Sequence, residues 1–291
     1  MGKNLVRLAC FALAAGCSSG PAPETTLGDV RVVALDATTP EVAPGDEVAL
    51  DALVADPKGG GTRLAMWTCT SIAPPGGDPA CLESAVGWGV GTGASTLIAG
   101  EPEAERFTAS LVTPAALAGV LTDEFPALPV TVWALACRDD LCPVLDAIDA
   151  AIDDGAVDDA LAADLADPAA WLAGLPFDGV SLARRSIVVS NRPAEERNTN
   201  PVLTVEPPAA FSPDVAVDVV VEAEDAEGDA ITVAPYTTAG GFGTILQLLV
   251  EAQPSTLPLY GPADGDSVRI YVTATDGVGG SASWSGDVPV E

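Results

Sequence analysis

Apolar and polar residues alternate along most of this chain, with the period of two that is typical of half-buried β-strands. Between residues 30 and 57 this alternation is interrupted by turn sequences at residues 44–46 and at Pro57. Short strands separated by glycine and proline turns are typical of antiparallel sandwiches, and we predict one over residues 30–190. Its further strands are expected at Arg63–Cys69, Glu105–Thr113 and Pro129–Cys137.

Helical spacing replaces the alternation in one stretch, residues 143–176. Leu145, Ile148 and Ile152 recur at intervals of three and four residues, Gly155 interrupts the repeat, and a second repeat follows. Aspartates occupy many of the positions between these apolar residues. We therefore predict an amphipathic helical insert between the last two strands of the sandwich, which either covers its edge or end or binds a partner.

Alternation returns after a polar, proline-containing linker at residues 191–200. Every second residue is valine or alanine from Val215 to Ala223, and residues 268–274 repeat the pattern with valine, isoleucine and alanine. These segments predict a second sandwich over residues 201–291. The predicted fold class is all-β, with two sandwiches in tandem and a helical insert in the first.

The first residues have a pattern of their own. Lys3 and Arg7 precede an apolar run at Leu8–Ala15 that is too short to span a bilayer, and small residues then precede Cys17. Residues 1–16 resemble a bacterial lipoprotein signal peptide. The resemblance implies cleavage before Cys17 and lipidation of its sulfur.

Two observations extend this interpretation of the N-terminus. The residue after the predicted lipidated cysteine is Ser18, and in the lipoprotein family a serine there implies sorting to the outer membrane. Residues 17–29 are small, polar and proline-containing, which predicts a flexible tether between the lipid and the first sandwich. We therefore expect an exported outer-membrane lipoprotein.

Both predicted sandwiches contain segments that resemble known modules. TTPEVAPGDEVALDALVADP, followed by a tryptophan-bearing strand and RRSIVVSN, resembles bacterial immunoglobulin-like surface domains. That resemblance implies that Trp67 and Trp133 are core residues, with an exposed aromatic binding platform as the alternative. EAEDAEGDAITV and VRIYVTATDGVGGSASW resemble the B–C and F–G turns of PKD-type or cadherin-like modules.

Acidic residues crowd the first of those two turns, and the resemblance implies that Asp276 lies near it. Calcium prefers six to eight oxygen ligands, which clustered carboxylates at loop ends supply. The same residues also make ordinary turn sequences, so a plain acidic turn is the alternative. The candidate calcium ligands are Glu224, Asp225, Glu227, Asp229 and Asp276.

Four cysteines remain outside the signal peptide and Cys17, an even number that predicts disulfides in an exported protein. Three pairings are possible, and we favour the two that close short loops after predicted strands. A metal site of four thiolates is the alternative, but the spacing lacks a repeated C-x-x-C. The favoured pairs are Cys69 with Cys81 and Cys137 with Cys142.

Charge narrows the range of functions. The formal net charge is −30, and removal of Lys3 and Arg7 with the signal peptide takes it to −32, which excludes nucleic-acid binding.

The chain has no histidine, so it has no Ser-His-Asp triad, no Cys-His pair and no His-ligated zinc. Four arginines near the linker are expected either to form ion pairs or to bind an anion or an acidic polysaccharide: Arg184, Arg185, Arg192 and Arg197.

Together these features predict a non-enzymatic, lipid-anchored protein of the cell envelope that serves as an adhesion, scaffold or ligand-presenting module. The alternative is an accessory lipoprotein of a secretion, transport or polysaccharide system that recognises its partner through the helical insert. The expected partners are the membrane, through the lipid, and a protein or polysaccharide. No cofactor is expected apart from the candidate calcium ion.

Overall fold

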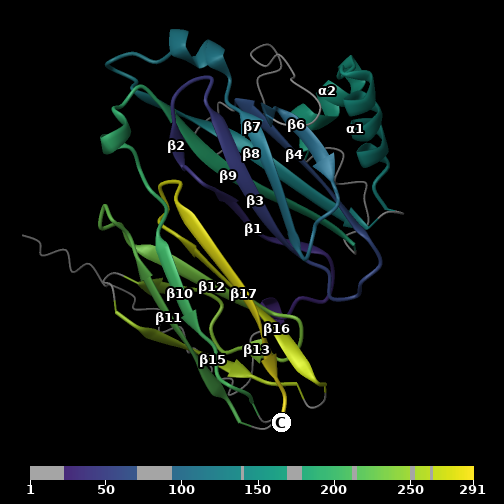
Figure 1. The fold of residues 1–291 in the computed structure, drawn as a ribbon, viewed down its shortest axis with the longest axis vertical. Helices are drawn as coiled ribbons and strands as arrows, with labels where there is room; N and C mark the ends of the chain where they lie inside the picture. The colour runs from purple at the N-terminus through teal and green to yellow at the C-terminus, as the bar shows by residue number, and fades with distance from the viewer. Residues whose placement is uncertain are drawn as a thin grey trace, which may run out of the picture.

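Strands in the described part of the chain form four sheets (Figure 1). The computed structural model describes residues 23–70, 94–138, 141–168, 179–211, 215–249, 253–262 and 265–291. The predicted signal peptide, Cys17 and Cys81 lie outside the described residues.

The first sandwich is built from nine strands of the described chain: β1 (Arg31–Ala37), β2 (Glu41–Val42), β3 (Glu47–Ala55), β4 (Thr62–Thr70), β5 (Ala94–Ser95), β6 (Leu97–Gly100), β7 (Arg106–Val112), β8 (Ala127–Arg138) and β9 (Val180–Ser190). One sheet has the order β1–β3–β7–β5 and the other the order β2–β9–β8–β4–β6. Alternate residues of both sheets, such as Leu50 and Met66, point inward and form the first apolar core. Because side chains alternate between the two faces of a strand, this burial produces the period of two in the sequence.

The second sandwich follows a short 3₁₀ turn at Ala194–Glu196 and is built from eight strands of the described chain: β10 (Val202–Glu206), β11 (Val217–Glu224), β12 (Ile231–Thr237), β13 (Gly241–Phe242), β14 (Gln247–Leu249), β15 (Ser255–Tyr260), β16 (Ser267–Thr275) and β17 (Ser281–Pro289). Its sheets have the orders β10–β11–β15–β13 and β14–β12–β16–β17. Inward-facing residues of both sheets form a core of their own, which includes Val219, Phe242 and Val272.

Both sandwiches have the same strand order. β1, β3, β7 and β5 correspond to β10, β11, β15 and β13, and β9, β8, β4 and β6 correspond to β17, β16, β12 and β14. The parallel pairing of β2 with β9 has its counterpart in a parallel bridge between Phe211 and Val290. One difference is that β5 runs parallel to β7, whereas β13 is antiparallel to β15. Strands A, B, E and D facing C, F and G define immunoglobulin domains, so the chain folds as two immunoglobulin-like sandwiches in tandem.

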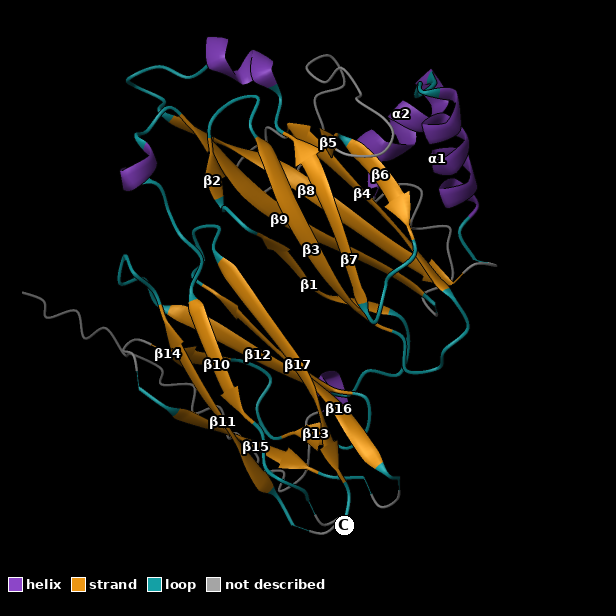
Figure 2. Ribbon diagram, viewed as in Figure 1, coloured by secondary structure: helices purple, strands orange, loops and turns teal. Residues whose placement is uncertain are grey.

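Two helices, α1 (Pro143–Asp154) and α2 (Asp159–Ala166), lie between β8 and β9, where the sequence predicts the helical insert. Gly155 ends α1 with a φ of 69°, which glycine adopts without strain. Asp158 caps α2, because its carboxylate accepts a hydrogen bond from the backbone N–H of Leu161. Both helices cover the outer face of the sheet that contains β4 and β8 (Figure 2). Residues 169–176 of the predicted insert lie outside the described residues.

A third apolar core joins the two sandwiches. Leu53 and Ala55 alternate with residues of β3 that face the first core, and Tyr271 alternates with residues of β16 that face the second sandwich's core. All three therefore point outward, yet their exposed fractions are 0%, 0% and 1%. They are buried because they pack against one another and against Leu27. The outer faces of two sheets, one from each sandwich, thus contact each other along β1, β3 and β16.

The N-terminal segment differs from the flexible tether that its composition predicts. In the described part of that segment, Thr25 and Leu27 are 0% and 3% exposed. The backbone N–H of Phe242 donates to Thr25 Oγ1 at 2.8 Å, and the backbone N–H of Leu27 donates to the Thr237 carbonyl at 2.7 Å. Composition cannot reveal partners that lie 217 residues away in the sequence. Residues 24–29, which we call the N-terminal strap, are therefore bound to the protein rather than free.

Candidate functional site

The outer face of the β4–β8 pair is buried under the two helices. Trp67 and Trp133 stack there, with ring centroids 6.4 Å apart and planes at 21°. The indole N–H of Trp67 donates to the Leu165 carbonyl at 3.0 Å. Both tryptophans are core residues, as predicted, but their core lies between sheet and helices rather than between the two sheets. The alternative of an exposed aromatic platform is therefore wrong.

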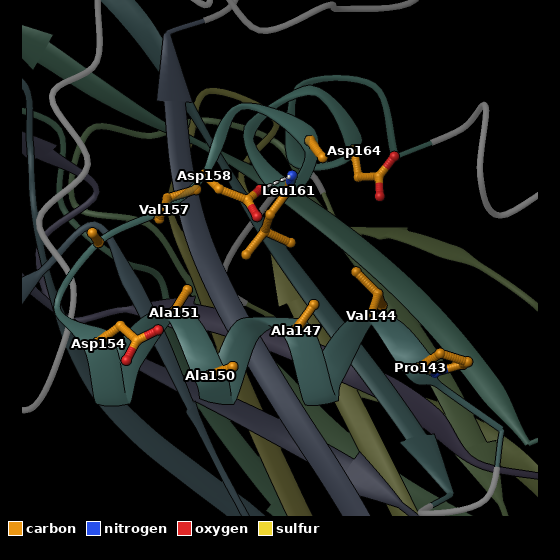
Figure 3. A pocket seen from close by; sticks show the side chains of 12 residues that line it. Pro143, Val144, Ala147, Ala150, Ala151, Asp154, Val157, Asp158, Leu161 and Asp164 are labelled. Atoms are coloured by element: carbon orange, nitrogen blue, oxygen red, sulfur yellow. Dashed lines mark hydrogen bonds between the residues drawn. The ribbon is translucent and has the colours of Figure 1, made fainter.

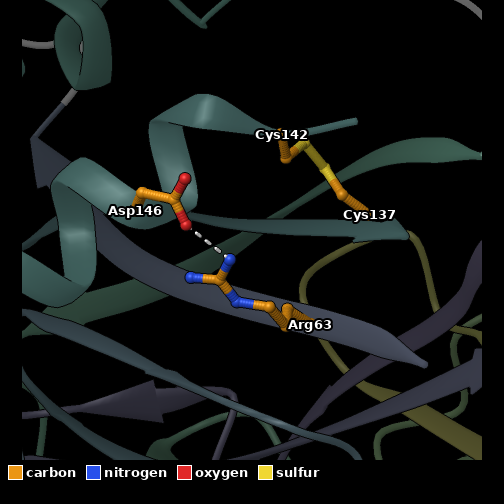
Figure 4. Close-up of a disulfide and its surroundings, with 4 residues drawn as sticks. All are labelled: Arg63, Cys137, Cys142 and Asp146. Atoms are coloured by element: carbon orange, nitrogen blue, oxygen red, sulfur yellow. Dashed lines mark hydrogen bonds and ion pairs between the residues drawn. A yellow bond between two sulfur atoms is a disulfide. The ribbon is translucent and has the colours of Figure 1, made fainter. Parts of the chain in front are cut away.

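A disulfide fixes the start of α1 to the sheet. Cys137 at the end of β8 is bonded to Cys142, the N-cap of α1, with their Cα atoms 5.9 Å apart (Figure 4). This is the pairing that the loop length favours, and it prevents the helix from leaving the sheet at this end. Cys69 is also disulfide-bonded. Its predicted partner, Cys81, lies outside the described residues, so that pairing stays a prediction.

An ion-pair cluster holds the side of α1 against β4. Arg63 donates a hydrogen bond to Asp146 at 2.7 Å (Figure 4). It forms a second ion pair with Asp149. The hydrogen bond with Asp146 raises the pKa of the Arg63 guanidinium, so its positive charge is retained against burial. Two aspartates of the acidic insert are thus bound to the sheet below.

A groove of about 700 Å³ separates α1 from α2 (Figure 3). Its walls are largely apolar and come from both helices and the loop between them: Val144, Ala147, Ala151, Val157 and Leu161. Three aspartates line the same groove: Asp154, Asp158 and Asp164. Apolar walls beside carboxylates suit a segment that carries both apolar and basic side chains. Sequence analysis located the insert but not the groove, because the groove depends on the spacing of two helices.

The five predicted calcium ligands do not form a metal site. Asp276 Oδ1 instead accepts hydrogen bonds from the backbone N–H groups of Val278, Gly279 and Gly280, at 2.8–2.9 Å. Asp225 Oδ1 likewise accepts from the N–H groups of two turn residues, Glu227 and Asp229, at 3.0 and 3.1 Å. No group of three or more histidine, cysteine, aspartate or glutamate side chains in the described chain could hold a metal ion. Asp225 and Asp276 therefore stabilise their own turns, as in the alternative explanation, and Glu224 is the last residue of β11.

Arg185 lies where the two sandwiches meet. It donates to the Leu35 carbonyl at 2.8 Å and forms an ion pair with Asp36 at 3.7 Å, both in the first sandwich. It also donates to the Ser281 hydroxyl and the Gly279 carbonyl of the second sandwich. Burial lowers the pKa of the Arg185 guanidinium, and the negative charge of Asp36 opposes that shift.

The other arginines near the linker do not gather into one anion site. Arg192 forms an ion pair with Glu41 at 3.4 Å, and Arg197 donates to the Arg192 carbonyl at 3.1 Å. Arg184, which precedes Arg185 on β9, is exposed. The expectation that these arginines form ion pairs is confirmed for Arg185 and Arg192.

Sequence analysis missed a second polar link between the sandwiches. Glu105, in the turn before β7, accepts hydrogen bonds from the Tyr271 hydroxyl at 2.8 Å and from Arg269 Nε at 2.9 Å. Glu105 has a φ of 72°, which is uncommon for a residue with a side chain and indicates backbone strain. Burial and then the hydrogen bond with Glu105 raise the pKa of Tyr271, so the folded state favours the protonated phenol.

Membrane association was the other sequence-based expectation. None of the helices that the structure describes is both long and apolar enough to cross a bilayer. Cys17 lies outside the described residues, so its lipidation stays a prediction.

Comparison with known proteins yields distant likenesses only. No family model matches the chain, and no curated protein matches it in sequence. A chimeric titin Z1Z2–Z1Z2 tandem is 11% identical, with 88% of this chain and 96% of the titin chain covered at a TM-score of 0.29. Red sea bream transglutaminase is 7% identical, with 89% of this chain and 31% of the enzyme covered at a TM-score of 0.27. Escherichia coli alpha-2-macroglobulin activated by porcine elastase is 9% identical, with 90% and 22% covered at a TM-score of 0.24.

This chain therefore spans less than a third of the transglutaminase and of the macroglobulin. The low TM-scores do not establish a shared arrangement over the aligned lengths, so the immunoglobulin-like assignment rests on the strand orders given above.

Proposed function

We propose that this chain is a non-enzymatic, lipid-anchored protein of the cell envelope that acts as an adhesion, scaffold or ligand-presenting module. The observation that carries the proposal is the third apolar core, which buries Leu53, Ala55 and Tyr271 between the sandwiches. A protein that presents a surface at a distance from a membrane needs domains held in fixed relation, and this core supplies that fixed relation. The resemblance of the second sandwich to PKD-type and cadherin-like modules agrees with an adhesive or scaffolding role.

Two further features support an exported, anchored protein. Disulfides form and persist in oxidising compartments, and Cys137 and Cys142 are bonded. The N-terminal pattern, with a short apolar run and small residues before Cys17, provides the anchor. The serine that follows favours the outer membrane as its destination.

Replacing Cys17 with serine is expected to abolish association of the protein with the outer membrane. The wild-type chain, expressed in a bacterium that processes lipoproteins, should fractionate with the outer membrane and gain the mass of its lipid. The Cys17→Ser chain should lose that mass and fractionate as a soluble or inner-membrane precursor. Fractionation and intact-mass measurement of both chains check this expectation. Unaltered outer-membrane association of Cys17→Ser would contradict the proposal.

The groove between α1 and α2 favours a second candidate function, an accessory lipoprotein that binds a partner through its helices. Its apolar walls and the carboxylates of Asp154, Asp158 and Asp164 would accept a protein segment with apolar and basic side chains. Both candidate functions share the anchor. Replacing Asp154 and Asp158 with asparagine distinguishes them. The second candidate function predicts that these substitutions abolish capture of the partner at the membrane, and the first predicts no such dependence on the groove.

A further inference from the structure

Both walls of the groove between α1 and α2 are fixed to the first sandwich. The Cys137–Cys142 disulfide holds the start of α1 at the end of β8. The indole N–H of Trp67, on β4, donates to the Leu165 carbonyl and holds α2 over the sheet. The groove is therefore formed in the folded chain, and a ligand that enters it does not have to order the two helices.

The shape of the groove suits a helix. Alanines line both walls and the loop between them, and Figure 3 shows Leu161 of α2 pointing toward α1. A helix packs closely, with an interaxial distance of about 8–10 Å, where the facing side chains are small. The walls extend about 18 Å along α1 and about 12 Å along α2, which is about two to three helical turns. The alanines are Ala147, Ala150, Ala151, Ala156 and Ala160.

Carboxylates lie at both ends of the groove. Asp154 and Asp158 flank the turn that joins the helices, and Asp164 lies toward the end that carries Val144 (Figure 3). Asp164 follows Asp158 by six residues, a rise of about 9 Å along a helix. Residues 139–183 contain no lysine or arginine, so this segment supplies no cation to the groove. A helix that enters the groove is therefore favoured by basic side chains about 9–10 Å apart.

A second copy of this chain does not offer such a helix. None of the helices in the described ranges contains a lysine or arginine. Of the 12 basic residues of the chain, Lys3 and Arg7 belong to the predicted signal peptide, and seven others form ion pairs within the chain. The net charge of −30 also makes two copies repel each other. The seven are Lys58, Arg63, Arg106, Arg138, Arg185, Arg192 and Arg269.

We propose that the groove binds an amphipathic helix of another protein, with lysine or arginine at positions i and i+7 and large apolar side chains at i+3 and i+4. Positions seven residues apart lie on one face of a helix and about 10 Å apart, which matches the spacing of the carboxylates. The two apolar positions share that face and fill the space above the alanines. This inference rests on the second candidate function, partner binding through the helices, and names the kind of partner.

A designed peptide of about 18 residues, rich enough in alanine to populate a helix, tests this occupant. It carries two lysines seven residues apart and leucines three and four residues after the first lysine, with alanine and glutamine elsewhere. Fluorescence anisotropy of a label on the peptide measures its binding to the mature chain, residues 17–291, with Cys17→Ser. We expect saturable binding that Asp154→Asn with Asp158→Asn weakens about fivefold. Asparagine is a good helix N-cap, so the substitution at position 158 keeps α2 capped.

Two controls separate the groove from general attraction to an acidic chain. Asp153→Asn with Asp159→Asn removes the same charge from the same two helices outside the groove lining, and should change the affinity less than about twofold. A peptide of the same composition in shuffled order, which cannot place its leucines and lysines on one face, should bind about tenfold more weakly. Absence of saturable binding, equal affinity for the shuffled peptide, or an equal loss in the two double variants would overturn the proposal.

Failure of the helical occupant and failure of the candidate function give different results. If the designed peptide does not bind but capture of a partner at the membrane still depends on Asp154 and Asp158, the helical occupant is refuted and the second candidate function stands. If neither the peptide nor a partner depends on these two carboxylates, both are refuted.

Discussion

Replacing Tyr271 with alanine is expected to lower the free energy of unfolding by about 3–5 kcal/mol, the range for loss of a large buried side chain. The ring is 1% exposed and packs against Leu53 and Ala55 of the other sandwich. Its hydroxyl also donates to Glu105 at 2.8 Å, so the substitution leaves a carboxylate with one hydrogen bond fewer. Urea denaturation followed by circular dichroism measures the change.

Two further variants serve as controls: one keeps the packing of the ring and removes its hydrogen bond, and the other truncates an exposed side chain elsewhere. Tyr271→Phe keeps the ring and removes the hydrogen bond to Glu105, so its effect should be smaller, about 2 kcal/mol. Val202→Ala truncates a side chain that is 68% exposed and should change stability by less than about 0.5 kcal/mol. If Tyr271→Ala behaved like Val202→Ala, the third core would not contribute to stability and the account of the junction would be wrong.

Removal of the Arg185 side chain should have an effect of similar size. The Arg185 side chain is 10% exposed and its partner Asp36 is 17% exposed, so Arg185→Ala leaves a largely buried carboxylate without its cation. Breaking a buried ion pair from one side typically costs about 3–5 kcal/mol. The substitution also removes hydrogen bonds to Leu35, Gly279 and Ser281, which span both sandwiches. The urea midpoint should fall accordingly.

The neighbouring arginine provides a matched control. Arg184 lies on the same strand, points to the other face and is exposed, so Arg184→Ala should shift the midpoint little. Arg185→Lys keeps the charge but not the forked set of donors, and should fall between the two alanine variants. Equal midpoints for Arg184→Ala and Arg185→Ala would show that the buried cluster does not hold the sandwiches together.

The sequence pattern predicted most strands and helices because the positions of buried and turn residues depend on neighbouring residues in the chain. The alternation around Leu50 and Val272 comes from one buried face of a sheet, and the interruption at Gly155 comes from the left-handed conformation that glycine adopts readily. The Cys137–Cys142 bridge closes a short loop, so sequence spacing alone favoured it.

Contacts between distant segments were not predictable in the same way. A period of two assigns Leu53 and Tyr271 to outward faces, but it cannot say that one outward face covers the other. For the same reason, tryptophans on the outer face of β4 and β8 were assigned to the sandwich core, and the N-terminal strap was expected to be free. The hydrogen bonds of Asp276 Oδ1 and Asp225 Oδ1 to backbone N–H groups of their own turns were likewise not visible in the acidic composition of these segments.

The central claim is that the third core, the buried arginine and the strap make the two sandwiches one rigid body. Residual dipolar couplings of the backbone amides, measured on the chain without its signal peptide and lipid, test that claim most directly. The account predicts that couplings from residues 31–190 and from residues 202–289 fit a single alignment tensor calculated from the structure. Two tensors of different magnitude or orientation would contradict it.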